Sequence, residues 1–262
     1  MIFIHNLSPD AVTLGPITLP WYGLLLSSGI ILSYLFLRWM FNKEGYPVSD
    51  LESVLIYLYL GLIIGARLGE VIFYDPVYYF KNPIDIVKIW MGGLSSHGAA
   101  MGLLISYFGW LKIHRKDFKR YADILVFGIP ITAAFVRTGN FFNSEIVGIP
   151  TNGRWGVVFK RLGEDFPRHP AQLYEAILCS VIFIVLLVIY LRYFKKTPSL
   201  FYVFFFMLLY FSGRFIIEFW KDLHVLPGWF PLSMGQVLSI LPILIATGYF
   251  LIIFPSQKKF KK

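Results

Sequence analysis

The chain has 262 residues, of which 57% are hydrophobic and 19% aromatic, while only 15% are charged. Soluble globular domains carry about 25% charged residues, so this composition excludes an ordinary soluble protein. The net charge of +9 would suit a nucleic acid, but its distribution along the chain indicates membrane topology, and we expect no nucleic-acid partner. The single cysteine, Cys179, excludes an internal disulfide and a cysteine-based metal cluster.

Seven apolar stretches are long enough to cross a hydrocarbon core, which takes about 20 residues of helix. In chain order they cover residues 20–41, 53–74, 94–112, 121–137, 172–192, 199–219 and 231–254. The N-terminus has neither a basic region nor a small-residue cleavage site, so we expect the first stretch to be retained. The sequence therefore predicts an all-α polytopic membrane protein with seven transmembrane helices, forming one integral membrane domain over residues 1–262.

The basic residues indicate the orientation of these spans. Of the 24 lysines and arginines, 14 fall in connections on one side of the membrane and 7 on the other. Cytoplasmic connections carry the basic excess, so we expect the N-terminus outside and the C-terminus in the cytoplasm. Residues 138–171 would then form a small extracytoplasmic head region between spans four and five. Within it, Asn152-Gly153 is typical of a hairpin turn.

Ionisable side chains are costly within a membrane, so each one in a span is a candidate for a functional site. Under the predicted orientation nearly all of them, with several polar neighbours, fall at the outer ends of five spans. These residues are Arg67, Glu70, His97, Arg137, Asn140, Asn143, Glu145, Arg168, His169, Gln172, Glu175, Arg214 and Glu218. Asp123, at the inner end of span four, is the exception. The sequence thus predicts one polar site near the outer leaflet.

Two interpretations of these charges stay open. Arg67 with Glu70, and Arg214 with Glu218, have the spacing at which two side chains on one helix neutralise each other. Arg137 has no acidic residue one turn earlier, which favours an anionic ligand for its guanidinium. A phosphodiester suits the planar, forked geometry of arginine.

Three further side chains have the chemistry that such a site needs. His97 lies in the glycine-rich segment 92–98 and is either a core histidine or a base with room for a substrate beside it. Tyr22 and Tyr210 each lie within two residues of glycine or serine near the outer end of a span. Both are positioned to donate hydrogen bonds to a phosphate.

Six short blocks carry a resemblance to a known family. They are "WYGLLLSSG", "GGLSSHGAAMG", "RTGNFFNSEIVG", "RHPAQLYEA", "GRFIIEFW" and "LSMGQVLS". In this order they resemble the bacterial prolipoprotein diacylglyceryl transferases over nearly the whole chain. The third block is similar to the family signature GRxGNFxNxExxG, with Val136 at its leading glycine, and Ala99 replaces the last glycine of the family's HGG.

The resemblance implies a transferase of the bacterial inner membrane, with its active site towards the extracytoplasmic face. Its partners would be phosphatidylglycerol, as the diacylglyceryl donor, and a preprolipoprotein signal peptide with a lipobox cysteine, as the acceptor. A thioether would form and glycerol phosphate would leave, with membrane lipids surrounding the enzyme. No cofactor and no metal are expected.

The resemblance also implies roles for individual residues. Arg137 would bind the lipid headgroup, in a mouth shaped by Asn140, Asn143 and Glu145. Arg214 would hold the departing phosphate, His97 would be the base, and Tyr22 and Tyr210 would be supporting donors. Further support would come from Arg67, Glu70, His169, Gln172, Glu175 and Glu218.

Three other classes of protein compete with this interpretation. The main alternative is a membrane transporter or channel for an anionic solute, but its path would need polar residues at the inner face, where only Asp123 lies. A phospholipid phosphatase would need a histidine–aspartate relay or a metal site, which the sequence does not offer. A non-catalytic scaffold is disfavoured by the cost of so many charges at the outer ends of spans.

Overall fold

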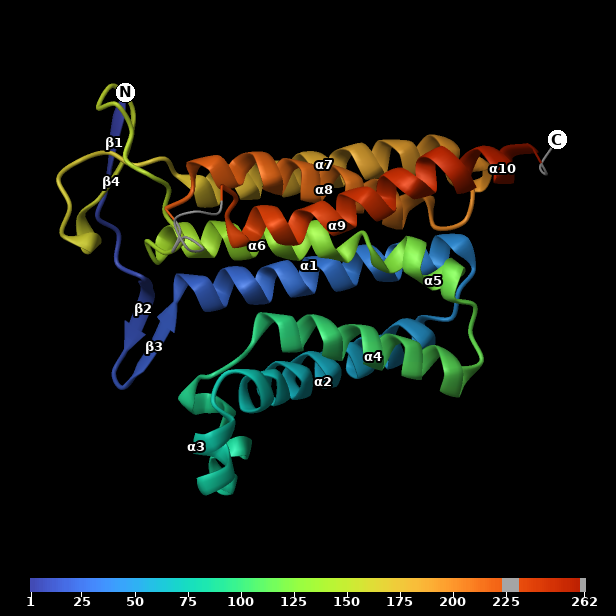
Figure 1. Cartoon of the computed structure of the whole chain (residues 1–262), viewed down its shortest axis with the longest axis horizontal. Coiled ribbons are helices and arrows are strands. Elements are labelled where there is room, and N and C mark those ends of the chain that lie inside the picture. Colours follow the sequence, from blue (N-terminus) through green and yellow to red (C-terminus); the bar gives the residue numbers. More distant parts are fainter. Residues whose placement is uncertain (223–230, 260–262) are drawn as a thin grey trace. The chain divides into compact units, whose positions relative to one another are not determined.

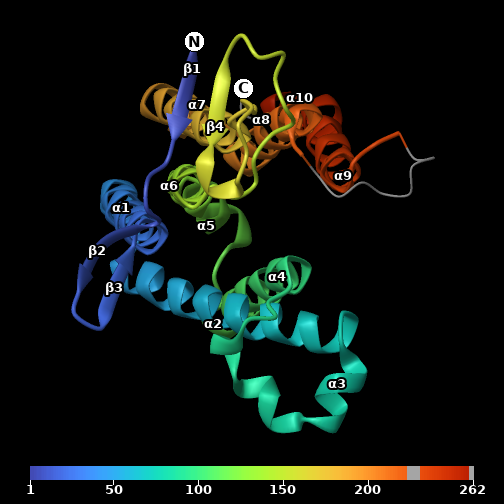
Figure 2. The same cartoon turned by 90° about the vertical axis from the view of Figure 1, so that its left-hand side faces the viewer.

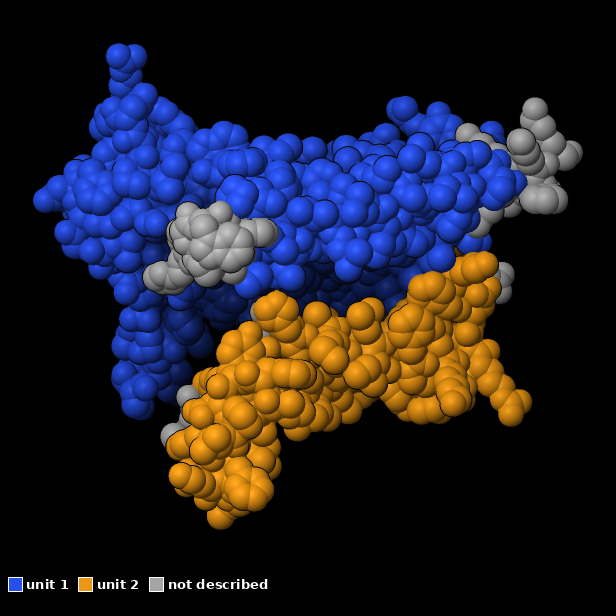
Figure 3. Space-filling model, viewed as in Figure 1, with its two compact units in different colours: residues 1–37, 122–262 blue, residues 38–121 orange. Residues whose placement is uncertain are grey.

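The computed structural model describes residues 1–222 and 231–259, which fall into two compact units (Figure 3). Unit 1 combines Met1–Leu37 with Ala122–Lys262, and unit 2 is Arg38–Tyr121. Unit 2 is thus inserted between the first helix of unit 1 and the rest of that unit.

Unit 1 is built mainly from long apolar helices that lie against one another. Helix α6 packs on α7, α7 on α8, and α8 on α9, so that the first turns of α7 and α9 and the last turns of α6 and α8 are close (Figure 1). The helices are α1 (Trp21–Glu44), α5 (Phe118–Leu125), α6 (Gly128–Phe142), α7 (Ala171–Tyr193), α8 (Phe201–Ile217), α9 (Met234–Gly248) and α10 (Phe254–Lys259).

Four short strands lie outside these helices. Strand β1 (Ile2–His5) pairs in parallel with β4 (Gly156–Phe159), while β2 (Asp10–Leu14) and β3 (Ile17–Pro20) form an antiparallel hairpin (Figure 2). The predicted hairpin at Asn152-Gly153 is therefore wrong. The strand after that turn takes the N-terminal strand as its partner.

Within residues 1–222 and 231–259, six helical segments are long and apolar enough to cross a membrane, which confirms a polytopic membrane protein. They are Trp21–Glu44, Val48–Phe73, Tyr121–Phe142, Ala171–Lys196, Phe201–Trp220 and Met234–Ser256. Helix α4 (Ser96–His114) covers the expected third span but is not among the six. Its glycines and polar side chains, such as His97 and Lys112, lower its hydropathy. Apart from the short strands, the chain is thus an all-α membrane protein with about six long apolar helices.

Unit 2 is centred on α4 and α2 (Val48–Phe73), which pack closely along small residues. A Cβ atom on Gly65 would lie 2.4 Å from the carbonyl oxygen of Gly98, and one on Gly102 would lie 2.0 Å from that of Gly61. Small residues at every fourth position let two membrane helices approach this closely. Gly98, directly after His97, therefore serves helix packing.

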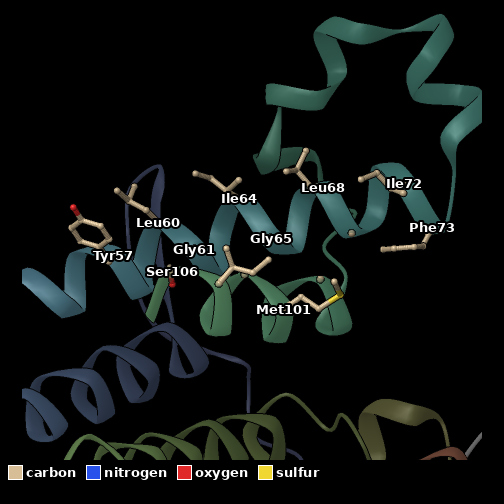
Figure 4. A pocket seen from close by; sticks show the side chains of 14 residues that line it. Tyr57, Leu60, Gly61, Ile64, Gly65, Leu68, Ile72, Phe73, Met101 and Ser106 are labelled. Carbon is tan, nitrogen blue, oxygen red and sulfur yellow. The ribbon is translucent and has the colours of Figure 1, made fainter. Parts of the chain in front are cut away.

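The α2–α4 pair also carries an apolar groove of about 480 Å³ (Figure 4). The side chains along it include Leu60, Ile64, Leu68, Ile72 and Met101. Between the two helices, the chain forms α3 (Pro76–Lys81) and the 3₁₀ turns η1 (Pro83–Val87) and η2 (Ile89–Met91).

Asp123, the charged exception at the inner end of span four, has a structural partner. Its carboxylate accepts hydrogen bonds from the backbone N–H groups of Leu200 (2.6 Å), Tyr202 (2.9 Å) and Val203 (3.2 Å). These groups belong to the first turn of α8, where helical N–H donors lack a partner in the helix. Asp123 therefore caps α8, and its burial does not require a transport path.

Candidate functional site

A buried chain of charges joins α6, α7 and α8 in unit 1. Arg137 Nε lies 2.6 Å from Glu175 Oε2, and Lys221 Nζ lies 2.6 Å from Glu175 Oε1. Lys221 Nζ also lies 3.2 Å from Glu218 Oε2, while Ser233 Oγ donates to Glu218 Oε1 at 3.1 Å. The side chains of Glu175, Lys221 and Glu218 are only 4%, 3% and 2% exposed. Charges this deeply buried need partners, and here they are one another's partners.

Arg214 belongs to the same group of charges. It lies within electrostatic range of both Glu175 and Glu218, and of the side chain of Tyr210 one turn earlier on α8. We call Arg137, Glu175, Arg214, Glu218 and Lys221 the charged cluster. Three cations and two carboxylates leave it with one positive charge in excess. In a setting of low dielectric constant, such an excess strongly attracts an anion.

Arg137 has no acidic residue one turn earlier on its own helix, but it has an acidic partner on another helix. Spacing along one helix excludes an acid only on α6, whereas Glu175 approaches from the first turns of α7. Arg137 Nη1 also donates to Asn140 Oδ1 at 3.3 Å. Its Nη2 makes no hydrogen bond within the part of the chain that the structure describes. One edge of the guanidinium therefore stays available, on a side chain that is 19% exposed.

The polar residues of the signature bond mainly to one another. Glu145 accepts from Asn140 Nδ2 at 3.0 Å and from Asn143 Nδ2 at 3.3 Å. Gln172, fully buried on α7, donates to the backbone carbonyl of Glu145 at 2.5 Å. These bonds fix the loop that follows α6. Asn140 thus connects that loop directly to Arg137.

The same loop holds two non-glycine residues in the left-handed region. Ser144 has a φ of 58° and Ile146 a φ of 54°, a conformation that is rare for a β-branched residue. Each such residue costs about 1–3 kcal/mol, and such strain is found most often at functional sites. Ser144 Oγ lies 3.4 Å from Nδ1 of His5, a fully buried histidine whose pKa is lowered by its burial.

Two glycines of the family blocks have packing roles around the charged cluster. A Cβ on Gly139 would lie 2.9 Å from the ring of Tyr22, so this glycine lets α1 bring Tyr22 against α6 two residues after Arg137. A Cβ on Gly235 would lie closer than 2 Å to the Glu218 carboxylate. A larger residue at this position would displace the Glu218 carboxylate from its place in the charged cluster.

Arg168 and His169 belong to the structure of the head region. Arg168 binds both oxygens of Glu164 at 2.5 Å and Asp222 at 2.6 Å, and the neighbouring Glu164 carboxylate raises its pKa. His169 Nδ1 lies 3.0 Å from the hydroxyl of Tyr174, and burial lowers the pKa of this histidine. Both side chains thus have local partners.

Arg67, Glu70 and His97 belong to unit 2. The Arg67 guanidinium donates to the backbone carbonyls of residues 85, 86, 92 and 93, at 2.7–2.9 Å for the last three. Within the described residues it forms no ion pair with Glu70, so that suggested pairing is wrong. Arg67 instead fixes the connection that contains α3. His97 is exposed, with Nδ1 3.3 Å from the hydroxyl of Tyr74.

Lys221 is the residue that the sequence analysis missed. Lys221 is one of the seven basic residues in the predicted extracytoplasmic connections, and it follows Glu218 at the spacing of an ion pair on a helix. That spacing was the available signal. Its contact with Glu175, 46 positions earlier in the chain, had no signal in the sequence.

Comparison with known proteins gives consistent similarities along the whole chain. Residues 9–253 match the family model described as prolipoprotein diacylglyceryl transferase. The chain is 40% identical to the phosphatidylglycerol–prolipoprotein diacylglyceryl transferase of Tolumonas auensis over 256 residues, which cover 97% of this chain and 98% of that protein. The enzymes of the same name from Chloroherpeton thalassium and Bacteroides fragilis are each 36% identical, over 97% and 98% of this chain and 94% and 96% of their own lengths.

Proposed function

The chain belongs to the prolipoprotein diacylglyceryl transferase family, and we infer that it transfers the diacylglyceryl group of phosphatidylglycerol to a prolipoprotein. The acceptor is the thiol of the lipobox cysteine. Its sulfur forms a bond to the glycerol carbon while the bond from that carbon to the phosphate oxygen breaks. The thiol proton passes to a base, and glycerol phosphate leaves as an anion. Only the thiolate is a good nucleophile for this step.

We propose that the charged cluster binds the phosphate of phosphatidylglycerol. The observation that carries the proposal is its excess of one positive charge, held in a buried setting. The free edge of Arg137 suits a phosphate oxygen, since guanidinium groups bind phosphate through two parallel N–H groups. Asn140, Asn143 and Glu145 support this arginine by fixing the loop beside it.

Arg214 stabilises the leaving group in this proposal. Negative charge grows on the phosphate as the carbon–oxygen bond breaks, and a preorganised cation lowers the energy of that transition state. Tyr210, one turn earlier on α8, and Tyr22, packed against Gly139, are the supporting hydroxyl donors.

The transfer reaction itself tests the phosphate site. Purified protein, labelled phosphatidylglycerol and a lipobox peptide should give a labelled peptide. Arg137→Lys keeps the charge but loses the forked geometry, so we expect a loss of at least about 2–4 kcal/mol of transition-state stabilisation. Arg154→Lys, at an exposed position of the head region, is the matched control and should transfer normally. Normal transfer by a well-folded Arg137→Lys protein would refute the site.

His97 is our proposed base, on the strength of its sequence block. If it removes the thiol proton, His97→Gln should lose activity at neutral pH and regain part of it at high pH, where a thiol with a pKa of about 8.5 ionises by itself. Arg214→Ala should show no such recovery, because the phosphate still lacks its cation. Recovery in both variants, or in neither, would argue against these separate roles.

We also propose seven spans, with the N-terminus outside and the site at the extracytoplasmic face of the inner membrane. Helix α4 supports the seventh span because it lies antiparallel to α2 along glycines, and its 19 residues reach about 28 Å. In a Cys179→Ser background, a cysteine at position 152 should react with an impermeant maleimide in spheroplasts, and one at position 196 should not. The opposite pattern would invert the topology.

The Cys179→Ser background also tests the identity of the nucleophile. Cys179 is almost completely buried on α7, and in our scheme the reacting sulfur belongs to the substrate. The variant should therefore keep most of its transfer activity. The anion-transporter alternative loses its one inner-end candidate, since Asp123 caps α8.

A further inference from the structure

Lys221 occupies the centre of the charged cluster without belonging to any of the six family blocks. Its Nζ lies between Glu175 Oε1, at 2.6 Å, and Glu218 Oε2, at 3.2 Å, and its side chain is only 3% exposed. A lysine on a surface loop would keep its ammonium in water. Burial of this one between two carboxylates indicates a defined task within the cluster.

The backbone around Lys221 is fixed by the last residues of the signature. Ile149 N donates to Trp220 O at 3.0 Å, and Asp222 N donates to Val147 O at 3.2 Å, on either side of a bridge between Gly148 and Lys221. A Cβ on Gly148 would lie 2.4 Å from the Trp220 carbonyl oxygen and 2.5 Å from that of His169. Only glycine permits this approach, so the signature holds Lys221 in place.

The carboxylate of Glu175 is divided between two cations. One oxygen lies 2.6 Å from Arg137 Nε, and the other lies 2.6 Å from Lys221 Nζ. Without Lys221, both oxygens would be available to Arg137, and a forked arginine–carboxylate pair would form readily. That pair would occupy the edge of Arg137 that the phosphate needs, and the cluster would lose its excess positive charge.

We propose that Lys221 is a positioning residue for lipid binding, which holds Glu175 away from Arg137 and preserves one net positive charge in the cluster. This inference rests on the proposed phosphate site. It predicts that the net charge of the cluster, more than the lysine itself, controls the affinity for phosphatidylglycerol.

Steady-state kinetics with two substrates test this role. In Lys221→Met, the apparent KM for phosphatidylglycerol should rise about tenfold or more, while the KM for the lipobox peptide changes less than about twofold. Lys221→Arg keeps the charge and should stay close to wild type. Lys160→Met is the matched control, since Lys160 pairs with Asp165 on the surface of the head region and should alter neither KM.

The double variant Lys221→Met/Glu175→Gln distinguishes charge from structure, because it also removes the carboxylate that Lys221 holds away from Arg137. It removes one cation and one carboxylate, so the cluster again has one excess positive charge. We expect its KM for phosphatidylglycerol to return to within about threefold of wild type. A purely structural lysine would make the double variant no better than the single one, which would overturn the inference. The double variant also decides the question if Lys221→Met alone does not fold, because Glu218 keeps Ser233 at 3.1 Å and Arg214 within electrostatic range, and Arg137 keeps Asn140 at 3.3 Å.

Arg137→Lys, measured alongside, separates the two proposals. If Arg137→Lys is inactive and Lys221→Met has an unchanged KM for phosphatidylglycerol, the role of Lys221 fails while the phosphate site stands. If Arg137→Lys transfers normally, the phosphate site itself fails.

Discussion

Replacing Glu175 with glutamine removes the carboxylate that Arg137 and Lys221 share. Both ion pairs are 2.6 Å long; Glu175 and Lys221 are almost fully buried, and Arg137 is 19% exposed. Removing one partner of a buried pair costs about 3–5 kcal/mol, because the remaining charge stays uncompensated. Lys221 keeps Glu218 at 3.2 Å and Arg137 keeps Asn140 at 3.3 Å, so we expect the lower end, about 3 kcal/mol.

Thermal unfolding of the purified protein in detergent measures this loss. For a chain of about this size, 1 kcal/mol corresponds to roughly 2–4 °C, so the midpoint should fall by roughly 6–12 °C. The control is Asp165→Asn, which breaks an ion pair with Lys160 in which the aspartate is 89% exposed. Exposed pairs contribute about 0–1 kcal/mol, so its midpoint should move little. Equal midpoints for Glu175→Gln and Asp165→Asn would refute our description of the cluster as a buried, mutually compensated network.

Three further predictions concern other parts of the chain. Gly102→Leu should destabilise the protein by at least about 1–3 kcal/mol in thermal unfolding, because a Cβ there would lie 2.0 Å from the Gly61 carbonyl oxygen. Gly109→Leu is the control: a Cβ at Gly109 has open space, so this variant should keep the stability of the wild type. Burial lowers the pKa of His5 below its ordinary 6.5, so on acidification the unfolded chain takes up a proton before the folded chain does. The stability of the fold should therefore decrease as the pH drops below about 6.5. In unfolding curves measured at several pH values, His5→Phe should reduce this pH dependence. Asp123→Ala should cost about 1–2 kcal/mol through loss of the α8 cap, yet leave the KM for phosphatidylglycerol unchanged.

The long helices could be predicted from the sequence because lipid imposes length and apolarity on any span. The predicted end of span four, at residue 137, falls short of the helix end, since α6 continues to Phe142. Polar side chains suggested an end, but Arg137 and Asn140 find partners inside the protein, so the helix can carry them further. The pairing of β1 with β4 joins residues about 150 positions apart, and no local sequence pattern predicts such a contact.

The residue types of the site could be predicted, but their partners could not. Spacing along a helix identifies only local neighbours, so it suggested Glu70 for Arg67 and no acid for Arg137. In the structure, backbone carbonyls surround Arg67, and Glu175 reaches Arg137 from another helix. The glycines of the family blocks likewise became interpretable only with their neighbours in view, as Gly235 beside the Glu218 carboxylate illustrates.

The central claim, that the charged cluster binds the phosphate of phosphatidylglycerol, is tested most directly by binding without turnover. Thermal unfolding is measured in neutral detergent with a rising mole fraction of phosphatidylglycerol and no peptide, since a ligand that binds the folded state raises the midpoint. For the wild type and for Arg154→Gln, in the exposed part of the head region, we predict the same rise. For Arg137→Gln, we predict that at least about tenfold more lipid is needed for the same rise, the equivalent of about 1.4 kcal/mol. An Arg137→Gln protein that is stabilised by phosphatidylglycerol as strongly as the wild type would contradict the claim.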